Sequence, residues 1–316
     1  SNIICESRFS WISSEVRIVM KFVTYLDGKK ERVGVLNEDE TWVYPLRAFG
    51  MPYESMQEVV EKMSRAEKEL IGIYNRKEPD EIYGSLPLRN VVLLAPIPRP
   101  KQDIICLGIN YMEHAVESAR YKQEAFGGER PYAVYFSKRV NEAVPNKGFI
   151  EAHENLVDSL DYECELAVVI GKDAKNVPES EAADYIFGYT IINDVSARNV
   201  QTRHKQWYFG KSLDGFTPMG PCITTADSIA YPPKLSISSR VNGELRQNSN
   251  TELLIFDVAH VISELSAGMT LKAGTIISMG TPAGVGMGFQ PPRFLKPGDT
   301  VECIVEGIGT LVNTVK

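Results

Sequence analysis

Two glutamates, Glu163 and Glu165, are separated by one residue at the start of an apolar run, and this spacing could hold a metal ion. The run 166–170 reads Leu-Ala-Val-Val-Ile and ends at Gly171, a composition typical of a β-strand. Alternate residues of a strand share a face, so we expect both carboxylates to point the same way.

A third carboxylate, Asp194, follows another strand-like run at 189–192. If the two strands are neighbours, Asp194 completes a cluster that would repel itself unless a cation lay within it. Oxygen ligands without His or Cys favour a hard ion, Mg²⁺ or Mn²⁺. The alternative is that Glu163 and Glu165 lie on the solvent face of a half-exposed strand, where alternation is also common.

Other candidates for chemistry lie outside this stretch. His114 and Glu117 are three residues apart on a predicted helix at 111–119, so the His could act as a general base oriented by the Glu. Lys211 could pair with a substrate anion. The glycine-rich turn at 280–288 could bring backbone N–H groups to an anionic ligand, although it is not a P-loop. These side chains also have a plainer interpretation. His114 and Glu117 could be an exposed pair on a helix, and Lys211 could be a surface lysine.

Composition narrows the classes of protein. The 316 residues are 43% hydrophobic and 24% charged, with a net charge of -7 and no basic stripe, which argues against a nucleic-acid partner. No apolar run is long enough to span a membrane, and the start lacks a signal-peptide pattern. Five scattered cysteines without C-x-x-C favour reduced thiols and a cytoplasmic location, and four histidines make a multi-histidine zinc site improbable.

The pattern of elements predicts two domains. Residues 1–19 are interpreted as an extension or the remnant of a cleaved tag, and 20–98 as a small N-terminal α/β domain with one amphipathic helix at 55–75. Three prolines between 96 and 100 place the boundary near residue 98. Residues 99–316 are expected to form the second domain, which contains the candidates for chemistry, with strands at 104–107, 133–140 and 235–241 and a helix at 257–267.

Six motifs in fixed order resemble the fumarylacetoacetate hydrolase (FAH) family. They are G-x-N-Y-x-x-H-x-x-E (108–117), D-Y-E-x-E-L (161–166), N-D-x-S-A-R-x-x-Q (193–201), G-K-S (210–212), G-T-P-x-G-V-G (280–286) and L-K-P-G-D-x-V-E (295–302). The resemblance covers about residues 101–316. It is nearest to the bacterial acylpyruvase, oxaloacetate decarboxylase and hydroxyheptadienedioate isomerase branch.

The resemblance implies a mixed α+β, mainly β architecture, with an FAH-type mixed β-roll as the catalytic domain, and a homodimer. It implies that the three carboxylates bind Mg²⁺ or Mn²⁺, and that His114 and Glu117 are catalytic and lie on a lid helix. Lys211 matches the lysine that neutralises developing negative charge. Further substrate contacts are predicted at four positions: Gln201, Thr281, Lys138 and Arg198.

The implied activity is divalent-metal-dependent C–C bond cleavage of a small anionic 2-oxo or 2,4-dioxo acid through a metal-stabilised enolate. Acylpyruvate or fumarylpyruvate hydrolysis and oxaloacetate decarboxylation share this species. An alternative is isomerisation or decarboxylation of 2-hydroxyhepta-2,4-diene-1,7-dioate. A second alternative is a binding or regulatory protein that keeps the fold without catalysis.

Overall fold

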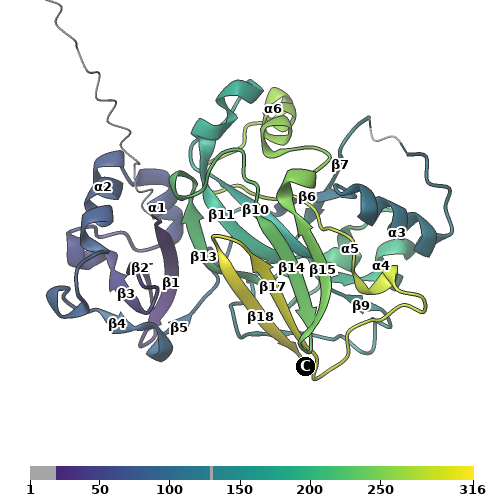
Figure 1. Ribbon diagram of the computed structural model, residues 1–316, viewed down its shortest axis with the longest axis horizontal. Helices are drawn as coiled ribbons and strands as arrows, with labels where there is room; N and C mark the ends of the chain where they lie inside the picture. Colours follow the sequence, from purple (N-terminus) through teal and green to yellow (C-terminus); the bar gives the residue numbers. More distant parts are fainter. Residues whose placement is uncertain (1–18, 129–130) are drawn as a thin grey trace, which may run out of the picture.

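The computed structural model describes residues 19–128 and 131–316 (Figure 1). The predicted extension at 1–19 lies, apart from residue 19, outside the described residues. Two β-sheets form the centre of the molecule, and helices lie around their ends and edges.

In the described part of the chain, eleven strands form the larger sheet. Its order is β4-β3-β2-β1-β13-β11-β10-β16-β6-β7, and β5 pairs with β1. The bounds are β1 Lys21–Asp27, β2 Lys30–Leu36, β3 Trp42–Pro45, β4 Leu86–Pro87, β5 Val92–Leu93, β6 Ile104–Gly108, β7 Val134–Lys138, β10 Cys164–Ile170, β11 Ile186–Asn193, β13 Met219–Thr225 and β16 Ile276–Ser278. The pairs are antiparallel except β16 with β6.

A second sheet of the described residues has the order β15-β14-β17-β18-β8 and covers one face of the first (Figure 1). Its strands are β8 Phe149–Ile150, β14 Ser236–Val241, β15 Glu244–Asn250, β17 Thr300–Val305 and β18 Gly309–Val315. A short pair, β9 Leu160–Asp161 and β12 Ser196–Ala197, lies apart from both. The expected mixed, mainly β architecture is confirmed.

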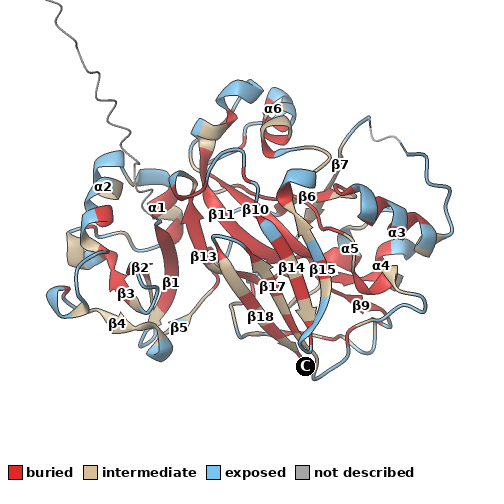
Figure 2. Cartoon of the chain, viewed as in Figure 1, coloured by how far each residue is buried: buried red, intermediate tan, exposed pale blue. Residues whose placement is uncertain are grey.

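The central strands β10 and β11 are buried along their whole length (Figure 2). Their apolar side chains contribute to a cluster on each face of the larger sheet: Leu166 and Ile191 belong to one, and Ala167 and Ile192 to the other. A strand covered on both faces needs a continuous apolar sequence, which explains the run at 166–170.

Helices surround the sheets, with bounds α1 Met56–Lys62, α2 Arg65–Tyr74, α3 Met112–Lys122, α4 Arg198–Arg203, α5 Tyr208–Lys211 and α6 Val258–Gly268. Short 3-10 helices are η1 Leu46–Phe49, η2 Pro79–Glu81, η3 Leu88–Asn90, η4 Glu179–Tyr185, η5 Ala226–Ser228, η6 Thr251–Leu253 and η7 Gly286–Gly288. No helix in the described ranges is long and apolar enough to cross a membrane.

The single helix predicted at 55–75 is wrong, because two helices occupy this region. The α1 helix ends at Lys62, and the Ser64 hydroxyl accepts a hydrogen bond from Glu67 N at 3.1 Å, which starts α2. A serine in this position competes for backbone N–H groups and begins a new helix more readily than it continues an old one.

The N-terminal segment continues the larger sheet. Strand β1 pairs with β13 in a register that places Phe22 opposite Ile223. The Phe22 ring stacks on Phe187 of β11 with centroids 5.9 Å apart. Backbone pairing and apolar packing therefore cross the boundary predicted near residue 98, and the division into two domains stays a prediction.

Candidate active site

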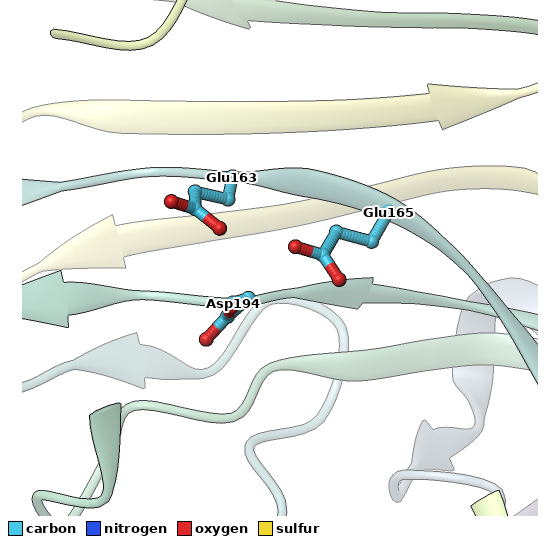
Figure 3. Close-up of side chains that lie close together, drawn as sticks. All are labelled: Glu163, Glu165 and Asp194. Carbon is cyan, nitrogen blue, oxygen red and sulfur yellow. The ribbon is translucent and has the colours of Figure 1, made fainter. Parts of the chain in front are cut away.

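Three carboxylates converge where β10 and β11 pair. The register sets Cys164 opposite Asn193 and Glu165 opposite Ile192, so that Asp194 follows directly beside the two glutamates. One oxygen from each of Glu163, Glu165 and Asp194 lies within 4.8 Å of the others, and all three side chains are buried (Figure 3). The structure thus brings together the three predicted metal ligands.

The hydrogen bonds of Glu165 test whether a cation fits. Its Oε1 accepts bonds from Ser278 Oγ at 2.6 Å and from Gly280 N at 3.1 Å. Its Oε2 is buried and has no partner among the described residues. A buried carboxylate oxygen without a donor is costly, and a hard divalent ion held by oxygen ligands would satisfy it. The donor set therefore fits Mg²⁺ or Mn²⁺.

Two buried lysines lie against the carboxylates. Lys211 Nζ lies 3.1 Å from Glu163 Oε2 and 2.8 Å from Asp194 Oδ2. Lys138 Nζ donates to Asp194 Oδ1 at 2.9 Å and to the carbonyls of Val195 and Lys211 at 3.0 and 2.5 Å. Lys138 uses its three donors within the protein, which suits it to hold Asp194. Its predicted contact with substrate gains no support from this geometry.

The third buried cation, Arg198, begins α4. It donates from Nε to Asp161 Oδ2 at 2.9 Å, and its Nη1 lies 2.8 Å from Glu163 Oε1 and 3.0 Å from Gln201 Oε1. Its Nη2 has no partner among the described residues. Arg198 therefore keeps one buried donor that a ligand in the same space could use.

The charges of this cluster act on one another. Burial favours the neutral form of Glu163, but Lys211 and Arg198 outweigh it and hold the pKa of Glu163 well below its usual range. Burial, reinforced by the charges of Asp194 and Glu163, raises the pKa of Glu165 well above its usual range. The protein therefore neutralises one glutamate with its own cations and leaves the other for a further positive charge.

The predicted pair on α3 is formed. His114 Nδ1 lies 2.7 Å from Glu117 Oε1, and both side chains are buried. Gly284 N donates to Glu117 Oε2 at 3.1 Å, and Arg120 donates to the carbonyl of Gly288. The glycine-rich turn thus holds the catalytic candidates, and a Cβ on Gly288 would lie only 2.0 Å from Glu117 Oε2.

One narrow cavity joins the two halves of the site. Its volume is about 20 Å³, room for about one water molecule. Predicted residues that line it are His114, Glu163, Arg198, Gln201 and Lys211. Thr281 is placed differently: its hydroxyl donates to Cys164 O at 2.8 Å and accepts from Gln247 Nε2 at 2.6 Å. Its predicted role in substrate binding stays a prediction.

Sequence reasoning missed several residues of the site. Asp161 accepts bonds from Gly286 N at 2.7 Å and Met287 N at 3.0 Å while pairing with Arg198, so it ties the glycine-rich turn to the carboxylate cluster. Its place at the start of D-Y-E-x-E-L was the available signal. Trp207 also lines the cavity. It packs so closely on Gly108 that a Cβ there would lie 2.2 Å from its ring, a contact that only the structure reveals.

Comparison with known proteins gives the same family as the motifs. Residues 103–316 match the family described as fumarylacetoacetate (FAA) hydrolase C-terminal. The chain is 46% identical over 241 residues to oxaloacetate tautomerase YisK of Bacillus subtilis, covering 76% of this chain and 78% of that protein.

Solved structures agree. A fumarylacetoacetate hydrolase from Exiguobacterium antarcticum is 38% identical, with a TM-score of 0.79 over 94% of this chain and 99% of that one. A probable 2-hydroxyhepta-2,4-diene-1,7-dioate isomerase from Mycobacterium abscessus is 31% identical, with a TM-score of 0.74 over 94% and 98%. The matched length and these identities show that the chain belongs to the fumarylacetoacetate hydrolase family.

Proposed function

We propose that this FAH-family enzyme uses a divalent cation to move a proton on a small 2-oxo acid, as in keto–enol tautomerisation of an oxaloacetate-like substrate. The activity first expected is C–C bond cleavage, and proton transfer without cleavage is proposed in its place. The similarity to an oxaloacetate tautomerase and to a probable hydroxyheptadienedioate isomerase supports the shift.

The observation that carries the proposal is a buried His–Glu pair whose His114 lines the same cavity as Glu163 of the carboxylate cluster. Glu117 accepts at His114 Nδ1, which leaves Nε2 as the nitrogen free to take a proton from carbon and return it elsewhere. Glu117 is itself fixed by Gly284 N, so the imidazole is held at a constant angle. A single oriented acid–base group is sufficient for proton transfer.

The cation would be held by Glu163, Glu165 and Asp194. When bound, it supplies a Lewis acid that stabilises negative charge on the 2-oxo oxygen of the substrate. Lys211 adds positive charge on the cavity side of the same carboxylates. The Nη2 of Arg198, which has no partner among the described residues, and the amide of Gln201 would bind the substrate carboxylate.

The cavity in this conformation is too small for a 2-oxo acid. Substrate entry therefore requires α3 to move away from the turn at Gly284–Gly288, which agrees with the lid role implied by the family resemblance. Closure would then exclude water from the reacting carbon. Homodimer formation and a cytoplasmic location remain part of the proposal.

A second candidate is hydrolytic cleavage of a 2,4-dioxo acid, which the similarity to a fumarylacetoacetate hydrolase favours. His114 would then take a proton from water, and the same cation would stabilise the departing enolate charge. The two reactions differ in whether a water molecule is activated, and both need the same residues.

A substrate panel tests the proposal. Purified protein is assayed with oxaloacetate, acetylpyruvate, fumarylpyruvate and 2-hydroxyhepta-2,4-diene-1,7-dioate, each with Mg²⁺, Mn²⁺ or EDTA. Faster enol–keto conversion of oxaloacetate, lost in EDTA, supports tautomerisation, and cleavage products without it support the second candidate. Full activity in EDTA contradicts metal dependence. Metal binding without turnover of any acid would instead indicate a binding protein.

A further inference from the structure

Lys122, at the end of α3, is half-buried, and the proposed chemistry does not use it. It lines the inner cavity together with His114 and Lys211, and it also lines the groove that opens outward beside Trp207. Its ammonium forms no ion pair within residues 19–128 and 131–316, and it lies over the Trp207 ring, 4.9 Å from the centroid.

An aromatic wall connects this lysine to the carboxylate cluster. Trp207 packs edge-on against Phe136 with centroids 5.3 Å apart, and Lys211 Nζ lies 5.0 Å from the Phe136 centroid. The wall therefore has one ammonium at its inner end, beside Glu163 and Asp194, and a second at its outer end. Both ammonium groups border the same cavity.

The position of the outer ammonium is set by the backbone. Gly108 ends β6, and the Trp207 ring lies so close to it that a side chain there would overlap the ring. Trp207 thus packs directly against the strand, and α3 carries Lys122 over its ring. When α3 closes on the glycine-rich turn, the ammonium is brought to the mouth of the cavity.

We propose that Lys122 binds a second anionic group at the far end of the substrate, which makes the enzyme selective for 2-oxo dicarboxylates. This rests on the proposed function, because the near end of the acid must lie at the carboxylate cluster. A carboxylate at the outer end would pair with Lys122 while the carbon chain between the two ends of the acid lay beside Phe136 and Trp207. A charge-assisted bond in a partly desolvated place contributes well to selectivity.

The charge balance supports this assignment. Burial lowers the pKa of Lys122, and the positive charges of Arg198 and Lys211 act in the same direction, whereas the carboxylates of Glu124 and Glu163 offset part of this effect. An ammonium in such a place is stabilised by an incoming anion more than an exposed lysine would be. A monocarboxylic acid of equal length would leave it without that partner.

Matched ligands test the proposal directly. The pair 2-oxoglutarate and 2-oxopentanoate has the same chain length and differs only in the terminal carboxylate, and 2-oxoadipate with 2-oxohexanoate extends the reach by one carbon. Binding to the full chain with Mg²⁺ is measured by calorimetry. We expect the diacid of at least one pair to bind about tenfold more tightly or better, corresponding to about 1.4 kcal/mol.

Lys122→Met keeps an apolar stem over Trp207 and removes only the charge. It should abolish the preference for diacids without weakening the binding of monoacids, and Lys122→Arg should restore it. The control is Lys205→Met, an exposed lysine that borders the outer groove but does not line the inner cavity. The ratio of diacid to monoacid affinity of Lys205→Met should stay within about twofold of the wild-type ratio.

Equal affinities for diacid and monoacid in the wild type would overturn the proposal, as would failure of all four acids to bind. An effect of Lys205→Met as large as that of Lys122→Met would also overturn it, because general positive charge would then explain the preference. The proposed function fails separately: diacid selectivity without metal-dependent turnover contradicts the function and leaves the role of Lys122 intact.

Discussion

The carboxylate cluster and the His–Glu pair meet at one cavity, through Glu163 and His114, but are held in place in different ways. The cluster lies on β10 and β11 in the middle of the larger sheet, where each strand has a partner on both sides. The pair lies on α3, which exposes Met112 and Val116 and is joined to the glycine-rich turn by bonds from Gly284 and Arg120.

This difference separates two tasks. Strand register brings the three carboxylates together, and contacts from distant segments such as Ser278 and Lys138 hold them there, so the candidate metal site can be preorganised. The helix can leave the turn at the cost of a few hydrogen bonds, which allows substrate to enter. Substitutions in the cluster should therefore affect cation binding, and substitutions on α3 should affect substrate binding or turnover without changing cation binding.

The largest effect is expected from Glu165→Ala. The variant loses the oxygen that lacks a protein donor, so Mn²⁺ binding measured by calorimetry should vanish and turnover should fall by about a thousandfold or more. Glu154→Ala, which removes an exposed glutamate, is the matched control. Normal Mn²⁺ affinity in Glu165→Ala would contradict the assignment of the cluster.

His114→Ala should break the other side of the comparison. It removes the proton-transferring group and should lower kcat by about 10²–10⁴-fold while Mn²⁺ affinity stays at the wild-type value. His204→Ala, which alters an exposed histidine, serves as the control. If cation binding fell together with kcat, the two regions would not be independent.

Gly288→Ala tests the contact between α3 and the turn. The added Cβ would overlap Glu117 Oε2 and push the carboxylate away from His114, so kcat should fall by about ten- to a hundredfold with unchanged Mn²⁺ affinity. Gly268→Ala, at the end of α6 in open space, should leave activity unaltered. Wild-type kcat in Gly288→Ala would show that the turn does not position the pair.

The smallest effect concerns stability. The pKa of Glu165 is raised in the folded chain, so the folded state binds the extra proton, and stability falls as pH rises from the ordinary carboxyl pKa of about 4.3 toward the raised one. In EDTA, Glu165→Gln should be more stable than the wild type at pH 8 by on the order of 1–2 kcal/mol, and the gap should shrink at pH 5.

Denaturant unfolding measures this difference. Added Mg²⁺ should reverse the order at pH 8, because the ion stabilises only the chain that binds it. A wild type that is more stable than Glu165→Gln in EDTA at pH 8 would show that Glu165 is already neutralised by the protein.

The convergence of the three carboxylates, the predicted metal ligands, could be foreseen because it depends on two local rules. Side chains alternate along a strand, which places Glu163 and Glu165 together, and Asp194 directly follows the neighbouring strand. The prediction assumes that the strands carrying the glutamates and preceding Asp194 are neighbours. The family resemblance carried by the six ordered motifs agrees with this assumption. The His114–Glu117 contact was predictable for a similar reason, since three residues along a helix bring side chains together.

The rest depends on contacts between segments that no local rule connects. Ser278 reaches Glu165 across 113 positions of sequence, and Gln247 joins Cys164 and Thr281 from the second sheet. A substrate contact of Lys138 is predicted together with the family resemblance, but tertiary packing turns its ammonium toward Asp194. The apolar spacing continues from α1 into α2, so it predicts one helix. The start of a second helix at Ser64 depends instead on the hydrogen bond that its hydroxyl accepts from Glu67 N.

The pairing of β1 with β13 has a consequence for any shortened form of this enzyme. Removing the strands before residue 98 would leave β13 with a row of free backbone donors and acceptors, and Ile223 and Phe187 would lose their apolar cover. Exposed edge strands of this kind can pair with strands of other chains and so cause aggregation. By pairing with β13, the N-terminal segment is therefore expected to protect the chain against aggregation.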